Sequence, residues 1–197
     1  VYGDELFNKL YGDIPAIDES LVIAAPHESS YFLNDRELLI VDTPGHAYHH
    51  FCVVDSFSKG IFTGDTFGLA YPDILHHNKR IVLPTTTPTH FNPQALFNSI
   101  DLLMSFKPER MYMTHFNILP DPASVVDQYR TSLQSFVDLT ESIKPVDESF
   151  LPVMVEAMGS IISKQFVLDR EIINNQLAMD IKLNCQGLIY WYQHRSA

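Results

Sequence analysis

The sequence is poor in cysteine and in basic residues. It has two cysteines, Cys52 and Cys185, which are too few for a disulfide framework, and Cys52 lies in the apolar run Phe51–Val54, which indicates a buried thiol. The 13 lysines and arginines are outnumbered by 24 aspartates and glutamates, so the formal net charge is −11. Because nucleic-acid backbones and anionic membrane surfaces would repel such a chain, neither is expected as its partner.

Long apolar runs are also absent. No segment approaches the roughly 18 apolar residues that a membrane-spanning helix needs. No signal peptide is visible, although a part of the protein before Val1 could hold one. Hydrophobic residues make up 46% of the 197 residues and the mean hydropathy is −0.02, which indicates a globular, core-forming protein. We therefore expect one domain, or one domain with a helical extension, in the cytoplasm.

The first 119 residues alternate between strand patterns and helix patterns. A short helix is expected over residues 1–12. Asn34 and Asp35 supply turn chemistry between two apolar runs, which predicts a β-hairpin. Asn92 followed by Pro93 is a favourable start for a helix that ends before Pro108. Strands are expected over residues 21–25, 31–33, 37–41, 51–54, 60–63, 80–83 and 110–114.

The rest of the chain is predicted to be helical. Apolar residues at helical spacing indicate one helix from Asp121-Pro122 to Pro145, a second over 148–167 and a third over 169–193. Strands that alternate with helices favour a layered α/β architecture. We predict an α/β domain over residues 1–119 and a helical extension over residues 120–197 that packs on it.

Three side chains that can bind metal follow three of the apolar segments. His46 ends a Thr-Pro-Gly-His string, Asp65 ends a Thr-Gly-Asp string, and His115 closes the run that begins at Arg110. Zinc and iron bind neutral imidazole nitrogens and carboxylate oxygens. One carboxylate can also bridge two cations through its two oxygens. Since loops at strand ends bring distant residues together, we expect these three residues to form a metal site.

The same strings carry a resemblance to a known family. Asp42–His46, Phe62–Phe67 and Tyr112–Phe116 resemble the second half of a metallo-β-lactamase-fold hydrolase, and Leu83–Pro88 and Leu183–Trp191 extend the resemblance over nearly the whole chain. The resemblance implies the αβ/βα sandwich of that family, which holds two metal ions between its sheets. The family's first ligand cluster, a His-x-His-x-Asp-His run, is absent from the 197 residues. The resemblance therefore implies a partial fold, the C-terminal part of the domain.

The resemblance assigns a role to each candidate residue. His46 would bind the first metal ion, His115 would bind the second, and Asp65 would bridge both ions as the catalytic carboxylate. His50 matches a family histidine that supports the ligands and does not bind metal itself. Two divalent ions are implied as cofactors, with zinc favoured over iron and manganese.

A pocket for a small-molecule substrate is expected beside these ligands. Phe67 and Tyr71 border the site in the sequence, and they could line this pocket or pack in the core. The sequence does not identify the substrate, because substrate choice depends on pocket loops and not on the fold.

The missing ligand run has two consequences. His46 and Asp65 give one ion two protein ligands, and Asp65 and His115 give the other ion two, whereas zinc sites use three or four. The chain alone should therefore bind metal weakly. A missing layer of strands would also expose apolar surface, which a partner or a homo-oligomer would have to cover. We interpret the chain as truncated and not degenerate, because all three ligand positions are retained.

Three functional hypotheses remain open at this point. A full-length parent would be a metal-dependent hydrolase that uses metal-bound hydroxide to cleave an ester, a thioester, a lactone or a phosphodiester. The same donor atoms suit a di-iron oxygen-binding or redox protein of the same fold. In the third hypothesis, the chain is a truncated, non-catalytic binding module without enzyme activity of its own.

Overall fold

The computed structural model describes residues 4–86, 90–143 and 148–195. These residues form eight strands in two sheets. The strands are β1 (Ser29–Leu33), β2 (Arg36–Asp42), β3 (Phe51–Asp55), β4 (Gly60–Gly64), β5 (Leu69–His76), β6 (Lys79–Leu83), β7 (Arg110–Met113) and β8 (Ile118–Pro120).

The larger sheet has the strand order β1-β2-β3-β4-β7-β8. Strands β4 and β7 are parallel, and the other neighbouring pairs are antiparallel. The parallel pair is possible because a helix connects the two strands, as a crossover requires. Strands β5 and β6 form a separate hairpin. The carboxyl ends of β4 and β7 therefore lie at the same edge of the sheet.

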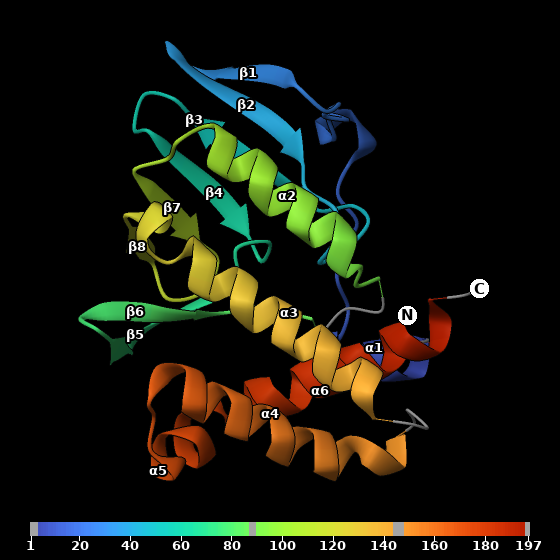
Figure 1. The fold of residues 1–197 in the computed structure, drawn as a ribbon. Coiled ribbons are helices and arrows are strands. Elements are labelled where there is room, and N and C mark those ends of the chain that lie inside the picture. The colour runs from blue at the N-terminus through green and yellow to red at the C-terminus, as the bar shows by residue number, and fades with distance from the viewer. Residues whose placement is uncertain (1–3, 87–89, 144–147, 196–197) are drawn as a thin grey trace.

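The helices cover one side of this sheet and the hairpin (Figure 1). Contacts place α3 between α2 on the sheet side and the pair formed by α4 and α6. The helices are α1 (Asp4–Tyr11), α2 (Pro93–Ser105), α3 (Val126–Ser142), α4 (Leu151–Phe166), α5 (Arg170–Ile172) and α6 (Ala178–His194). A π-helical turn, Ile173–Leu177, joins α5 to α6.

The helix predicted to begin at Asn92-Pro93 is confirmed as α2. The side chain of Asn92 accepts a hydrogen bond from the backbone N–H of Ala95 at 3.0 Å, which satisfies one of the free donors at the start of the helix. Pro93 occupies the first turn, where no N–H is needed. The predicted hairpin around Asn34 is also confirmed, by the pairing of β1 with β2.

Buried apolar residues of both sheets and of helices α2, α3, α4 and α6 form one continuous core. Val41, Ile61 and Met111 contribute to it from three strands of the larger sheet. Leu133 of α3 and Leu188 of α6 belong to the same core. The division between residues 119 and 120 into a domain and an extension stays a prediction.

The opposite face of the larger sheet carries one apolar, partly open row of side chains. The strand register aligns one residue from each of five neighbouring strands in a row, which we call the apolar row: Ile40, Val53, Phe62, Tyr112 and Ile118. Phe62 is 45% exposed and Ile118 is 41% exposed. Phe62 stacks on Tyr112 with ring centroids 4.5 Å apart. The exposed apolar surface that the sequence predicted is present at these residues.

Some predicted elements are wrong. The strand expected over residues 21–25 is absent from this described part of the chain, where a 3₁₀ turn, Glu19–Leu21, precedes extended backbone with exposed side chains. The helix expected to start at Asp121-Pro122 is a 3₁₀ turn, Pro122–Ser124, followed by α3. Its predicted end at Pro145 lies outside the described residues.

Strands β5 and β8 were not predicted. Strand β5 contains Pro72, which cannot donate to a strand ladder, and its register with β6 shifts between Ala70 and Leu75. Strand β8 has three residues and ends in Pro120. None of the helices in the described ranges is long and apolar enough to span a bilayer.

Candidate metal centre

A tight turn after β2 presents His46. Gly45 has a φ of +130°, and a Cβ at this position would lie 2.3 Å from the backbone nitrogen of Leu96 in α2. Only glycine tolerates this combination of backbone conformation and close approach. The hydroxyl of Ser99 in α2 donates to the carbonyl of Pro44 at 2.6 Å. Helix α2 therefore packs directly on the turn and fixes its position.

A second turn, after β4, presents Asp65. Gly64 has a φ of +49°, and a Cβ there would lie 2.4 Å from Nε2 of His50. The backbone N–H of Asp65 donates to this same nitrogen at 3.0 Å. The space that a side chain at position 64 would fill is thus occupied by the imidazole that holds Asp65.

Both ring nitrogens of His50 are used inside the protein. Its Nδ1 lies 2.9 Å from the hydroxyls of Thr43 and Thr66. Burial, and after it the nearby His46, lower the pKa of His50 to about 4, so the ring is neutral at pH 7. Because Nε2 accepts the amide hydrogen of Asp65, Nδ1 carries the ring proton and donates it to a threonine hydroxyl. His50 therefore positions the Asp65 turn and has no lone pair free for a metal.

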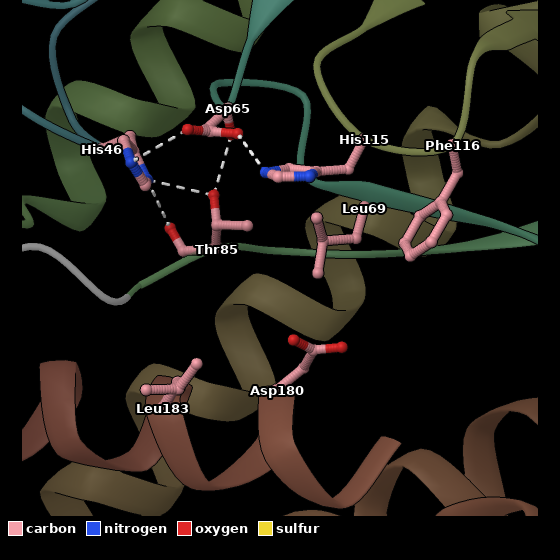
Figure 2. Close-up of a pocket in the computed structure, with 8 residues that line it drawn as sticks. All are labelled: His46, Asp65, Leu69, Thr85, His115, Phe116, Asp180 and Leu183. Atoms are coloured by element: carbon pink, nitrogen blue, oxygen red, sulfur yellow. Dashed lines mark hydrogen bonds and ion pairs between the residues drawn. The ribbon is translucent and has the colours of Figure 1, made fainter. Parts of the chain in front are cut away.

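The three predicted ligands meet at the strand ends (Figure 2). Nε2 of His46 lies 3.6 Å from Oδ2 of Asp65, and Nε2 of His115 lies 3.5 Å from Oδ1 of Asp65. Each oxygen of one carboxylate thus faces a different imidazole, at distances beyond those of a good hydrogen bond. Oδ1 of Asp65 is buried and has no hydrogen-bond partner in the described structure. This oxygen is therefore free to accept a hydrogen bond or to contact a cation.

Thr85 sets the tautomer of His46. Its hydroxyl donates to the carbonyl of Asp65 at 2.8 Å and lies 3.0 Å from Nδ1 of His46. The Thr85 carbonyl lies 3.2 Å from the same nitrogen and can only accept. Nδ1 of His46 therefore donates, and Nε2 keeps the lone pair that a metal ligand needs. Burial lowers the pKa of His46, which favours the neutral form of the ring.

A cavity of about 270 Å³ opens beside the three ligands. Figure 2 shows that residues of β5, of the loop after β7 and of α6 surround it. The lining residues are His46, Asp65, Leu69, Thr85, His115, Phe116, Asp180 and Leu183. The cavity thus has a polar end at the ligands and an apolar wall that carries one carboxylate, Asp180.

Of the two alternatives for Phe67 and Tyr71, lining the pocket or packing in the core, the structure shows packing. Phe67 is fully buried and stacks on Tyr129 with ring centroids 5.4 Å apart. Tyr71 is 6% exposed and lies behind the cavity wall, where its ring contacts Phe116 and its hydroxyl donates to Asp180. Both aromatic side chains belong to the hydrophobic core.

Sequence reasoning missed most of the cavity wall. Leu69 lies on β5, a strand that was not predicted, and Thr85 lies in the segment Leu83–Pro88 that the resemblance included without a role. The last residues of that segment, Thr87 and Pro88, lie outside the described residues. Asp180 and Leu183 come from α6, and no local pattern connects that helix with His46.

The three candidate ligands, His46, Asp65 and His115, do not form a complete metal site by themselves. Within the described ranges, no group of three or more His, Cys, Asp or Glu side chains is arranged to hold an ion. The ligands instead form two pairs that share Asp65. The donor atoms fit part of a two-metal site, because they are two imidazole nitrogens and a carboxylate with an unpartnered oxygen.

Comparison with known proteins identifies the family. The sequence model of the metallo-β-lactamase superfamily matches residues 3–115, more than half of the chain. The chain belongs to the metallo-β-lactamase superfamily, and the predicted α/β fold of that family is confirmed.

The relatives are longer than this chain. The metallo-β-lactamase fold-containing protein ST1585 of Sulfurisphaera tokodaii is 29% identical over 117 residues, which are 58% of this chain and 40% of that protein. Its crystal structure, described as the first of an archaeal member of the superfamily, matches with a TM-score of 0.58 and 20% identity, over 95% of this chain and 59% of that one. The family protein TTHA1429 of Thermus thermophilus matches with a TM-score of 0.50 and 11% identity, over 98% of this chain and 58% of that one. These structural similarities show the fold alone.

Proposed function

We propose that this chain carries part of the active site of a metal-dependent hydrolase that cleaves an ester, a thioester, a lactone or a phosphodiester of a small molecule. The observation that supports this proposal most directly is the position of Asp65 between His46 and His115, with one carboxylate oxygen toward each imidazole. This arrangement suits a carboxylate that bridges two cations. The superfamily generally binds divalent metals, and its fold is that of hydrolases.

In this proposal, His46 and Asp65 would hold one divalent ion, and Asp65 and His115 would hold the other. When bound, such ions supply an acidified water molecule and polarise the substrate oxygen at the scissile bond. Zinc is the favoured metal, and iron and manganese accept the same donor atoms. A cytoplasmic location belongs to the same proposal.

The residues behind the ligands keep them in the state that metal binding needs. Thr85 holds the ring proton of His46 on Nδ1, so that Nε2 faces Asp65. His50 anchors the backbone of Asp65 at 3.0 Å, which keeps the carboxylate between the two histidines. Because both supports are buried or partly buried, they hold the ligands without competing for the ion.

Two ligands for each ion are fewer than a zinc site uses, so complete activity requires ligands beyond these three residues. This shortfall also favours the second candidate function, a non-catalytic module of the same fold. The two candidates differ in metal content, because the hydrolase must retain ions through purification and the module need not.

The test is zinc titration followed by elemental analysis, on this chain, on Asp65→Ala and on a longer form where the gene encodes one. We expect weak binding to this chain, loss of that binding in Asp65→Ala, and close to two ions in the longer form, with hydrolysis of a thioester, lactone or phosphodiester panel. Asp73→Asn, which removes an exposed carboxylate on β5, is the charge-matched control. Undiminished hydrolysis in Asp65→Ala would refute the proposal, and an iron absorption band would identify the di-iron alternative.

A second variant tests the support of His46. Thr85→Val removes the hydroxyl contact with Nδ1 while the backbone carbonyl remains, so zinc affinity should fall by roughly threefold to tenfold. Thr85→Ser keeps the hydroxyl and should restore the affinity. Equal affinities for Thr85→Val and the wild type would show that the hydroxyl does not orient the ring.

A further inference from the structure

Asp180 stands across the cavity from the metal-ligand end. It lies in the first turn of α6, and Figure 2 shows its carboxylate pointing toward the space bordered by Leu69 and Phe116. Leu183, one turn further along the same helix, also lines the cavity. The carboxylate is thus the polar group of an otherwise apolar wall.

A buried tyrosine fixes the direction of this carboxylate. The hydroxyl of Tyr71 donates to Oδ2 of Asp180, and the Tyr71 ring packs against Phe116 with centroids 5.2 Å apart. Burial, and after it the hydrogen bond to Asp180, raise the pKa of Tyr71, so that its hydroxyl remains a donor. The tyrosine hydroxyl is neutral, so this hydrogen bond orients the carboxylate without placing a full positive charge beside it.

Cationic side chains of the described residues do not compensate this charge either. Among these residues, the ion pairs within 4.0 Å do not include Asp180. The described side chains that line the cavity contain neither lysine nor arginine. A charged hydrogen-bond donor stabilises a carboxylate more strongly beside apolar walls than in water. A cationic group that enters the cavity would therefore be attracted to Asp180.

We propose that Asp180 determines substrate specificity by binding an ammonium or other positively charged N–H group of the substrate, while Leu69, Phe116 and Leu183 contact its apolar part. This inference rests on the proposed hydrolase function and names its substrate class: esters, thioesters or lactones with an apolar body and a cationic end. Substrates that carry an anionic group in place of the cationic end are disfavoured, because the Asp180 carboxylate repels them. Tyr71 acts as a positioning residue for Asp180.

The first test measures binding and needs no catalysis. Hexylammonium, hexan-1-ol and hexanoate are titrated into the metal-free chain, and amide chemical shifts give the three dissociation constants. We expect hexylammonium to bind at least about threefold more tightly than hexan-1-ol, and hexanoate to bind most weakly. The ratio of the hexan-1-ol dissociation constant to the hexylammonium dissociation constant should approach one in Asp180→Asn. It should fall partly in Tyr71→Phe and stay unchanged in Asp73→Asn.

Three outcomes would overturn the inference. One is equal affinity of the wild type for hexylammonium and hexan-1-ol, or no detectable binding of the ammonium. Another is an unchanged ratio in Asp180→Asn. The last is a ratio that is lost in Asp65→Asn and kept in Asp180→Asn, because the ammonium would then occupy the ligand end of the cavity.

Hydrolysis separates this inference from the function on which it rests. The zinc-loaded longer form of the protein is assayed with two matched thioesters that end in an ammonium or in a methyl group. Turnover that depends on Asp65 but shows the same kcat/KM ratio in the wild type and in Asp180→Asn would overturn the specificity role alone. An ammonium preference in binding without any turnover would overturn the hydrolase proposal and leave the binding role of Asp180 standing.

Discussion

Nε2 of His50 accepts the backbone N–H of Asp65 at 3.0 Å, across fifteen residues of sequence. The imidazole fills the space beside Gly64, where a Cβ would approach to 2.4 Å. The turn that presents the central carboxylate is therefore shaped around a side chain from another turn, and its stability depends on that side chain.

His50→Ala should lower the free energy of unfolding by about 2–4 kcal/mol, because the change leaves the Asp65 N–H without its partner, removes one contact from each of two threonine hydroxyls and opens a cavity. Urea denaturation followed by circular dichroism measures this loss. His49→Ala is the matched control, since His49 is exposed and its loss should change the stability by less than about 0.5 kcal/mol. Equal effects of the two changes would show that the His50 network does not support the fold.

Gly45→Ala should be among the most damaging small substitutions. Its Cβ would overlap the backbone of Leu96, and its φ of +130° strains any L side chain. Overpacking and backbone strain together should cost about 2–4 kcal/mol in the free energy of unfolding. Gly12→Ala is the control, because Gly12 also has a positive φ, +65°, but open space around it. If both variants unfold at the same urea concentration, the contact with α2 is not what requires glycine at position 45.

Local patterns were sufficient to predict that His46 and Asp65 lie in turns at strand ends, and the structure places His115 beside Asp65. The Thr-Pro-Gly-His string and the Thr-Gly-Asp string each encode a turn at a strand end, and β4 and β7 are adjacent and parallel. The strings mark the turns, whereas the adjacency of β4 and β7 that brings Asp65 and His115 together is a property of the folded sheet. The family and its α/β architecture followed from the same strings.

The wall of the cavity could not be predicted in this way. Tyr71 and Asp180 are separated by 109 residues, and their hydrogen bond depends on how α6 packs against β5. Strand β5 itself is interrupted by Pro72, so its alternating pattern is weak and the inward direction of Phe67 and Tyr71 is not visible locally. The metal identity, the oligomeric state and the cytoplasmic location stay predictions.

Protonation of Asp55 at low pH should lower the free energy of unfolding. This carboxylate is buried and accepts hydrogen bonds from the Arg36 guanidinium and the Ser58 hydroxyl. The Arg36 hydrogen bonds hold the pKa of Asp55 well below its usual range. The unfolded chain therefore binds a proton at a pH where the folded protein does not, so this stabilisation is present above about pH 5 and is lost as the pH falls through the acidic range.

Urea midpoints of the wild type and Asp55→Asn at pH 7, 5, 4 and 3 check this linkage. The variant should be less stable at pH 7, and the difference between the two proteins should shrink as the pH falls. Asp73→Asn, which changes an exposed carboxylate, should leave the pH profile of the wild type unchanged. A constant difference between wild type and Asp55→Asn from pH 7 to pH 3 would contradict the linkage.

The apolar row should bind a hydrophobic dye. Phe62 and Ile118 are about half exposed on one continuous sheet face, and monomeric proteins rarely leave such a face uncovered. The folded chain should therefore enhance anilinonaphthalene sulfonate fluorescence at neutral pH. The double change of Phe62 and Ile118 to serine should roughly halve this signal, because it removes the two most exposed side chains of the row.

The control must separate this face from exposed aromatic residues in general. Phe57 is 82% exposed, but it lies in the turn between β3 and β4 and outside the apolar row. Phe57→Ser should therefore leave dye binding nearly unchanged. If this control lowers the signal as much as the double variant does, the dye is responding to scattered exposed side chains and the sheet face has no special affinity for apolar groups.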